Sequence, residues 1–81
     1  MEKNEIQKMI EIKRQAISTE NNRLLNLNNK MAVLANKIEL YEIESQAKLL
    51  EMKERYKQMQ RSFESGNKYI ESCEQFIAEN S

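Results

Sequence analysis

Few side chains in this sequence are suited to catalysis. Histidine, aspartate and tryptophan are absent, every acidic residue is a glutamate, and Cys73 is the only cysteine. A nucleophilic thiol needs a neighbouring base, and only Glu74 stands beside Cys73 in the chain. The sequence therefore predicts a non-enzymatic protein without a cofactor and without a small-molecule substrate.

Some glutamates are spaced closely enough on a helix to be considered as candidate metal ligands. They are Glu39, Glu42 and Glu44, and further along the chain Glu51 and Glu54. The di-iron helix pattern needs a histidine three residues after a glutamate, and this sequence has none. Alternating charges on a helix usually form its solvated face. We therefore predict no metal site.

Cys73 has two structural interpretations. In a parallel dimer, two copies of this residue would come close enough for a disulfide between chains. In the interpretation that we favour, Cys73 is a small buried apolar side chain. A single cysteine forms no disulfide within the chain, which fits a reducing, cytoplasmic location.

The charge pattern argues against nucleic acids and membranes as partners. Thirteen basic side chains balance thirteen acidic ones, and the most basic stretch, 53–61, is interrupted by Glu54. A basic-region zipper would instead need a dense run of arginine and lysine ahead of its leucines. No apolar run approaches the roughly 20 residues of a membrane span. We predict neither nucleic-acid binding nor membrane insertion.

The backbone of this chain is suited to helices. Proline is absent and Gly66 is the only glycine, so the sequence predicts an all-α protein with a single helical domain over 1–81. We expect a shorter helix over about 3–17, a long helix over about 23–64 and a terminal amphipathic helix over about 67–79. A bend within 18–29 is expected from the Ser, Thr and Asn residues there. At Gly66, a helix stop and a hinged continuation both remain open.

Two rows of mostly apolar residues recur in alternating steps of three and four. This is the spacing of the a and d positions of a coiled-coil heptad. The first seam also extends back to Ile10 and Ile17, although Lys13 and Glu20 weaken it there. We call the rows the first seam (Leu24, Leu27, Met31, Leu34, Ile38 and Tyr41) and the second seam (Leu49, Met52, Tyr56, Met59, Phe63, Gly66, Ile70, Cys73 and Ile77).

The two seams are out of phase by four residues between Ser45 and Leu49. In one continuous helix, such an offset is a stutter that locally unwinds a coiled coil. In the alternative, the two halves of the chain face different partners. Parallel and antiparallel arrangements of a dimer both remain open.

The length of the expected helix predicts a partner. A helix of about 35 residues is roughly 50 Å long, whereas a compact domain of this size has a radius of gyration near 12 Å. A helix of about 15 residues would cover only part of the apolar stripe. We therefore predict a homo-oligomer or a complex with another helical protein, with the two seams, Gly66 excepted, as the interface.

Two short groups of seam residues have alternative interpretations. Met52, Tyr56, Met59 and Phe63 form ordinary core or, because methionine repacks easily, an adaptable groove for a target helix. The terminal face around 69–77 is expected to dock on a protein partner or back onto the long helix, because its glutamates would be repelled by anionic lipid.

These features indicate an interaction protein, either a self-associating coiled coil or a small helical subunit of a complex. The alternative is a small helical chaperone, adaptor or inhibitor that masks a helix of its partner. In size and all-helical build, the chain resembles the small helical-hairpin co-chaperones of type III secretion needles. That resemblance implies a client-masking function and assigns no role to any residue.

Overall fold

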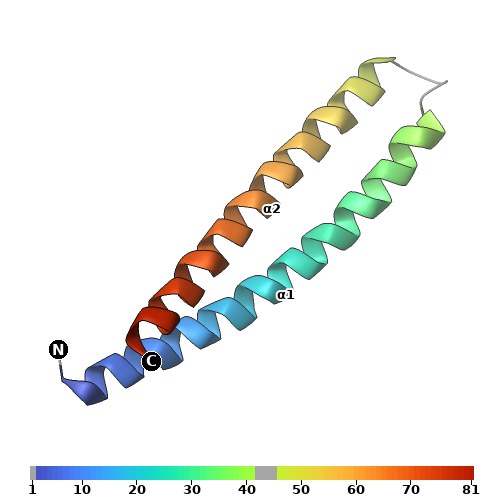
Figure 1. Ribbon diagram of the computed structural model, residues 1–81. Helices are drawn as coiled ribbons and strands as arrows, with labels where there is room; N and C mark the ends of the chain where they lie inside the picture. The colour runs from blue at the N-terminus through green and yellow to red at the C-terminus, as the bar shows by residue number, and fades with distance from the viewer. Residues whose placement is uncertain (1, 42–45) are drawn as a thin grey trace.

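The chain forms two long antiparallel helices. The computed structural model describes residues 2–41 and 46–81, and every regular element in this part of the chain is an α-helix. Helix α1 spans Lys3–Tyr41 and helix α2 spans Gln46–Asn80. They lie side by side along their length, with both chain ends at the same end of the molecule (Figure 1). The predicted all-α class is therefore confirmed, and the extended shape is compatible with a helical hairpin.

The hairpin is a thin rod. Its principal dimensions are 62 × 15 × 13 Å and its radius of gyration is 18.3 Å. We call the end with Lys3 and Asn80 the terminal end, and the end where α1 finishes at Tyr41 and α2 begins at Gln46 the distal end. Because the helices are nearly equal in length, each covers one side of the other over almost its whole extent.

The expected bend within 18–29 is wrong, because α1 is continuous from Lys3 to Tyr41. The Ser, Thr and Asn side chains of this stretch are exposed, so water satisfies them without a turn. On the opposite side of the same stretch, Ile17, Leu24 and Leu27 face α2 and are buried or half-buried. Packing of an apolar face contributes more to helix stability than local propensity does, and here it keeps the helix intact.

Asn29→Ala is expected to leave the hairpin intact and to be neutral or slightly stabilising. Asn29 is exposed in the interior of α1, and alanine has the higher helix propensity by up to about 0.7 kcal/mol. Thermal unfolding followed by circular dichroism measures the difference. A loss of more than about 1 kcal/mol would show that the Asn29 side chain caps a turn.

The expected continuous helix over 23–64 is also wrong. Residues 3–41 and 46–80 belong to two antiparallel helices, and Arg23 on α1 contacts Ser62 on α2. In one straight helix these two residues would be about 58 Å apart, at 1.5 Å per residue. The four-residue offset therefore separates the frames of two helices that face each other. The stutter was expected between Ser45 and Leu49; Ser45 lies outside the described residues, and 46–49 form the start of α2.

The terminal helix expected over 67–79 is not a separate element. Helix α2 runs through Gly66 without interruption, and this glycine does not have a positive φ. Of the two possibilities that the sequence left open at Gly66, a helix stop is excluded. The reason for a glycine at this position is a close contact with α1, described below.

The core is a single narrow row between the helices. Each buried apolar side chain of this size contributes about 1.5–3 kcal/mol relative to an exposed one. In the described part of the chain, the buried apolar residues are Leu24, Leu34, Met52, Ile70 and Cys73.

Candidate helix-packing interface

The two predicted seams pack against each other within one chain. Every predicted interface residue whose side chain the structure describes is buried or half-buried. Tyr41 ends α1, and its side chain lies outside the described part. The buried members are those of the core, and the half-buried members are Leu27, Met31, Ile38, Leu49, Tyr56, Met59, Phe63 and Ile77. The expectation that only another chain could cover the stripe is therefore corrected, because α2 covers one side of α1.

The first seam continues to the terminal end, as its extended frame predicted. Ile10 and Ile17 are half-buried, and so is Ile6 one step earlier. Half-burial is what a two-helix arrangement imposes, since each seam side chain contacts one neighbouring helix and keeps an edge in water. Each seam is therefore covered by the opposite helix on the side that faces it, and its remaining edges are exposed to water.

Two charged residues on the first seam are accommodated by partners. The Lys13 ammonium lies over the Phe76 ring, with 5.6 Å between Nζ and the ring centroid. At this distance a cation is attracted by the face of an aromatic ring. Glu20 is paired with Arg23, and only 18% of its side chain is exposed. Both charges therefore remain at the helix–helix contact without being left unpaired.

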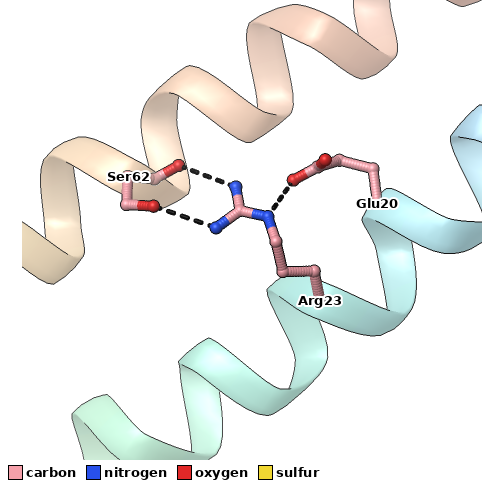
Figure 2. A network of polar contacts seen from close by, with 3 residues as sticks. All are labelled: Glu20, Arg23 and Ser62. Atoms are coloured by element: carbon pink, nitrogen blue, oxygen red, sulfur yellow. Dashed lines mark hydrogen bonds and ion pairs between the residues drawn. The ribbon is translucent and has the colours of Figure 1, made fainter.

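Arg23 connects α1 to α2 at the middle of the hairpin, as Figure 2 shows. Its Nε donates to Glu20 Oε1, its Nη1 donates to Ser62 Oγ at 2.9 Å, and its Nη2 donates to the Ser62 carbonyl at 3.3 Å. Because 46% of the Arg23 side chain is exposed, the network contributes at most about 1 kcal/mol. The planar guanidinium matches both Ser62 acceptors together, so the contact favours one register of the hairpin.

Gly66 lies directly against side chains of α1. A Cβ at this position would lie 2.6 Å from Leu24 Cδ2, 2.8 Å from Arg23 Nη2 and 2.9 Å from Glu20 Oε1. Such distances are shorter than van der Waals contact. The α1 side chains can pack this closely because glycine has no side chain. The packing against α1 offsets the roughly 1 kcal/mol that glycine costs inside a helix.

Cys73 is a buried free thiol, as the favoured interpretation predicted. Its side chain is 1% exposed, so it is not available to a second copy for a disulfide. A side-chain hydrogen bond with Cys73 raises the pKa of the neighbouring Tyr69 above its ordinary value. A phenol with a raised pKa stays neutral at physiological pH. Tyr69 and Cys73 on α2 therefore lie close together.

The glutamates tested as metal ligands do not gather into a site. In residues 2–41 and 46–81 there is no group of three or more acidic, cysteine or histidine side chains placed to hold a metal. Glu42 and Glu44 lie outside these ranges, and Glu39, Glu51 and Glu54 are exposed. Within 53–61, Lys57 pairs with Glu54 at 3.9 Å. The solvated-face interpretation of this region is consistent with these positions.

A groove lies between α1 and α2 near the distal end. It has a volume of about 570 Å³ and is lined by residues of 29–37 and 48–59. Its apolar members are Val33, Leu34, Met52 and Met59. We call it the distal groove. The two methionines belong to the row that the sequence predicted as core or as an adaptable groove. Met52 is buried, Met59 is half-buried, and both line the distal groove.

Sequence reasoning missed three features of this interface: the basic residues of the distal groove, the Arg23 bridge and the close approach at Gly66. The first carried a readable signal. In a heptad, the g position directly precedes a. The residues before Met31, Ile38, Leu49 and Tyr56 are all lysine or arginine. The other two depend on the pairing of α1 with α2, which the sequence did not reveal.

Comparisons with known proteins assign this chain to no family. Family models, curated proteins and solved structures give no match to this chain. Within the described ranges, neither helix has a stretch long and apolar enough to cross a membrane.

Proposed function

We propose that this chain is a non-enzymatic interaction protein that acts by packing its hairpin against further helices, either of a second copy or of another protein. The exposed edges of the half-buried seam residues, together with the exposed apolar side chains, would form the contact surface. The buried thiol of Cys73 supports a reducing compartment, such as the cytoplasm, as its location.

The observation that carries this proposal is the surface that the hairpin leaves exposed. The accessible surface is 6477 Å² for a chain of 9.6 kDa, whereas a compact monomer of that mass exposes roughly 5,100 Å². The excess of roughly 1,400 Å² on one chain is larger than the roughly 800 Å² that each partner buries in a standard protein–protein interface. Association would bring the exposed area closer to that of an ordinary protein.

The exposed area includes large apolar side chains of both helices. Large apolar side chains occur singly on most protein surfaces, but here they accompany half-buried seams on both helices. Leu40 is 74% exposed and Leu50 is 66% exposed. The other exposed large apolar residues of the described ranges are Ile12, Leu25, Val33 and Tyr69.

A chaperone, adaptor or inhibitor that masks a partner's helix is the second form of this proposal. The distal groove favours it, because Met52 and Met59 give that groove an adaptable apolar floor. The two forms differ in their occupant: a second hairpin in the first, and a helix of another protein in the second.

Size-exclusion chromatography with light scattering tests self-association. We expect a mass at least twice the 9.6 kDa of one chain, and a melting temperature that rises with protein concentration because assembly stabilises the folded state. Replacing both Leu40 and Leu50 by Gln should weaken association without reducing helicity, since both side chains are exposed. Asn36→Gln, also at an exposed site of α1, is the matched control.

If the partner is another protein, a different result is expected from the same measurements. The isolated chain would then be a monomer that binds an amphipathic helical peptide. A monomer that melts cooperatively at the same temperature at every concentration, and that binds no amphipathic helix of either charge, would overturn the proposal in both forms.

A further inference from the structure

The distal groove carries a concentration of positive charge above its apolar floor. Lys30, Lys37, Lys48 and Arg55 line it, and among the lining residues that the structure describes Glu51 is the acidic one. Lys48 has an interaction within the chain. The ion pairs described above, Arg23–Glu20 and Lys57–Glu54, do not involve Lys30, Lys37 or Arg55. An apolar strip bordered mainly by cations is therefore accessible between the helices.

The pairing of α1 with α2 places these cations opposite one another. Arg23 on α1 contacts Ser62 on α2. In an antiparallel pair, one heptad forward on α1 corresponds to one heptad backward on α2. This step brings Lys30 opposite Arg55, and the next brings Lys37 opposite the α2 residue Lys48.

Charges flanking a coiled-coil seam usually have opposite signs on the two helices and form salt bridges. Here Lys30 and Arg55 have the same sign, so they oppose the closure of the hairpin. Toward the terminal end the same rows are uncharged, with Ala16 and Met9 on α1 and Tyr69 and Phe76 on α2. The repulsion is confined to the distal groove, where an anionic occupant would relieve it.

We propose that the distal groove binds an acidic amphipathic helix of another protein, an inference that rests on the proposed function and specifies its partner. The apolar side of that helix would pack on Val33, Leu34, Met52 and Met59. Its glutamates or aspartates would pair with Lys30, Lys37 and Arg55. This is the helix-in-groove mode of recognition, with charge setting specificity and orientation.

The dimensions and composition of the groove favour a helix over a nucleic acid. The lining segments 29–37 and 48–59 correspond to about 12–17 Å of helix, or two to three turns. Among the lining residues that the structure describes, none is aromatic, whereas single-stranded nucleic acids are usually held by base stacking on aromatic side chains. An apolar floor matches the apolar face of an amphipathic helix.

The test uses a labelled three-heptad peptide with leucine at a and d and glutamate at e and g, and the same peptide with lysine in place of glutamate. Fluorescence anisotropy measures binding of each to the full chain. The glutamate peptide is expected to bind, and to bind more weakly as salt is raised. The lysine peptide is expected to bind at least about tenfold more weakly.

A double substitution separates binding from folding. Lys30→Glu with Lys37→Glu places carboxylates opposite the basic residues of α2, so the hairpin should melt at a higher temperature. The same change should weaken binding of the glutamate peptide about tenfold or more. The matched control is Lys8→Glu with Lys68→Glu, which makes the same net-charge change at two exposed sites outside the groove. It should change binding less than about twofold, because those sites are distant from the groove.

Several results would overturn the inference. Equal binding of both peptides, or equal binding by the groove and control variants, would remove the role of charge. Displacement of the glutamate peptide by a single-stranded oligonucleotide at similar concentration would show a general polyanion site. Loss of self-association in the groove variant alone would show that a second copy is the occupant. In that last case, and when the chain self-associates but binds no glutamate peptide, the proposed function stands and only this inference fails.

Discussion

Leu34→Asp is expected to abolish the folded hairpin. Leu34 is 5% exposed and belongs to the row of α1 that faces α2. The substitution loses about 2–3 kcal/mol of apolar burial and places a carboxylate where it has little access to water. The total stability of an 81-residue chain is only about 4–12 kcal/mol. A thin two-helix core should lie at the low end of this range, so one such change removes most of it.

Far-ultraviolet circular dichroism measures this outcome as loss of helicity and of the cooperative melt. The neighbouring substitution Val33→Asp is the control, because Val33 is 55% exposed and its carboxylate would remain hydrated. The control should change the free energy of unfolding by less than about 1 kcal/mol. If Leu34→Asp kept the wild-type melt, Leu34 could not be buried between α1 and α2, and the hairpin described here would be incorrect.

Gly66→Leu is expected to be the second most damaging change. A Cβ alone at this position would lie 2.6 Å from Leu24 Cδ2, and a leucine adds three more carbons in the same direction. Leu24 is itself buried at 5% exposure, so it has little free space to move into. The side chains of Leu24, Arg23 and Glu20 must shift or the helices must move apart, at a cost of about 2 kcal/mol or more. Thermal unfolding should show a melting temperature lower by about 8–16 °C.

Two further substitutions establish the cause of that loss. Ser65→Leu adds the same side chain at the adjacent exposed site of α2, where it should change the melting temperature little. Gly66→Ala gains about 1 kcal/mol of helix propensity but introduces the short contact with Leu24, so a small net loss is expected. A gain of about 1 kcal/mol for Gly66→Ala would show that position 66 is solvated and does not touch α1.

The residues of the interface could be predicted from the sequence because their spacing is a local property. Steps of three and four place residues on one face of any helix, whatever that face contacts. The described members of both seams are accordingly buried or half-buried, and Asn26, Asn28, Asn29 and Asn36 are exposed as expected. The frame also remained correct across Lys13 and Glu20, where polar residues interrupt it.

The helix boundaries were predicted less well, because they depend on competition between local and long-range terms. The polar residues of 18–22 have a modest preference for turns, but burial of Ile17 and Leu24 against α2 outweighs it. The glycine at position 66 has the same explanation, since its function is to admit Leu24. Neither outcome can be derived before the opposing helix is known.

By itself, the sequence determined that this chain is helical, which face of each helix is apolar, and that few of its side chains are suited to catalysis. Periodicity and composition act over a few turns and need no knowledge of the rest of the fold. The tertiary structure alone decided that the two apolar faces cover each other, that Gly66 lies against Leu24, and that Lys30 and Arg55 line the same apolar groove. Leu24 and Gly66 are 42 positions apart in the chain and Lys30 and Arg55 are 25 apart, and only the antiparallel pairing of α1 and α2 brings them together.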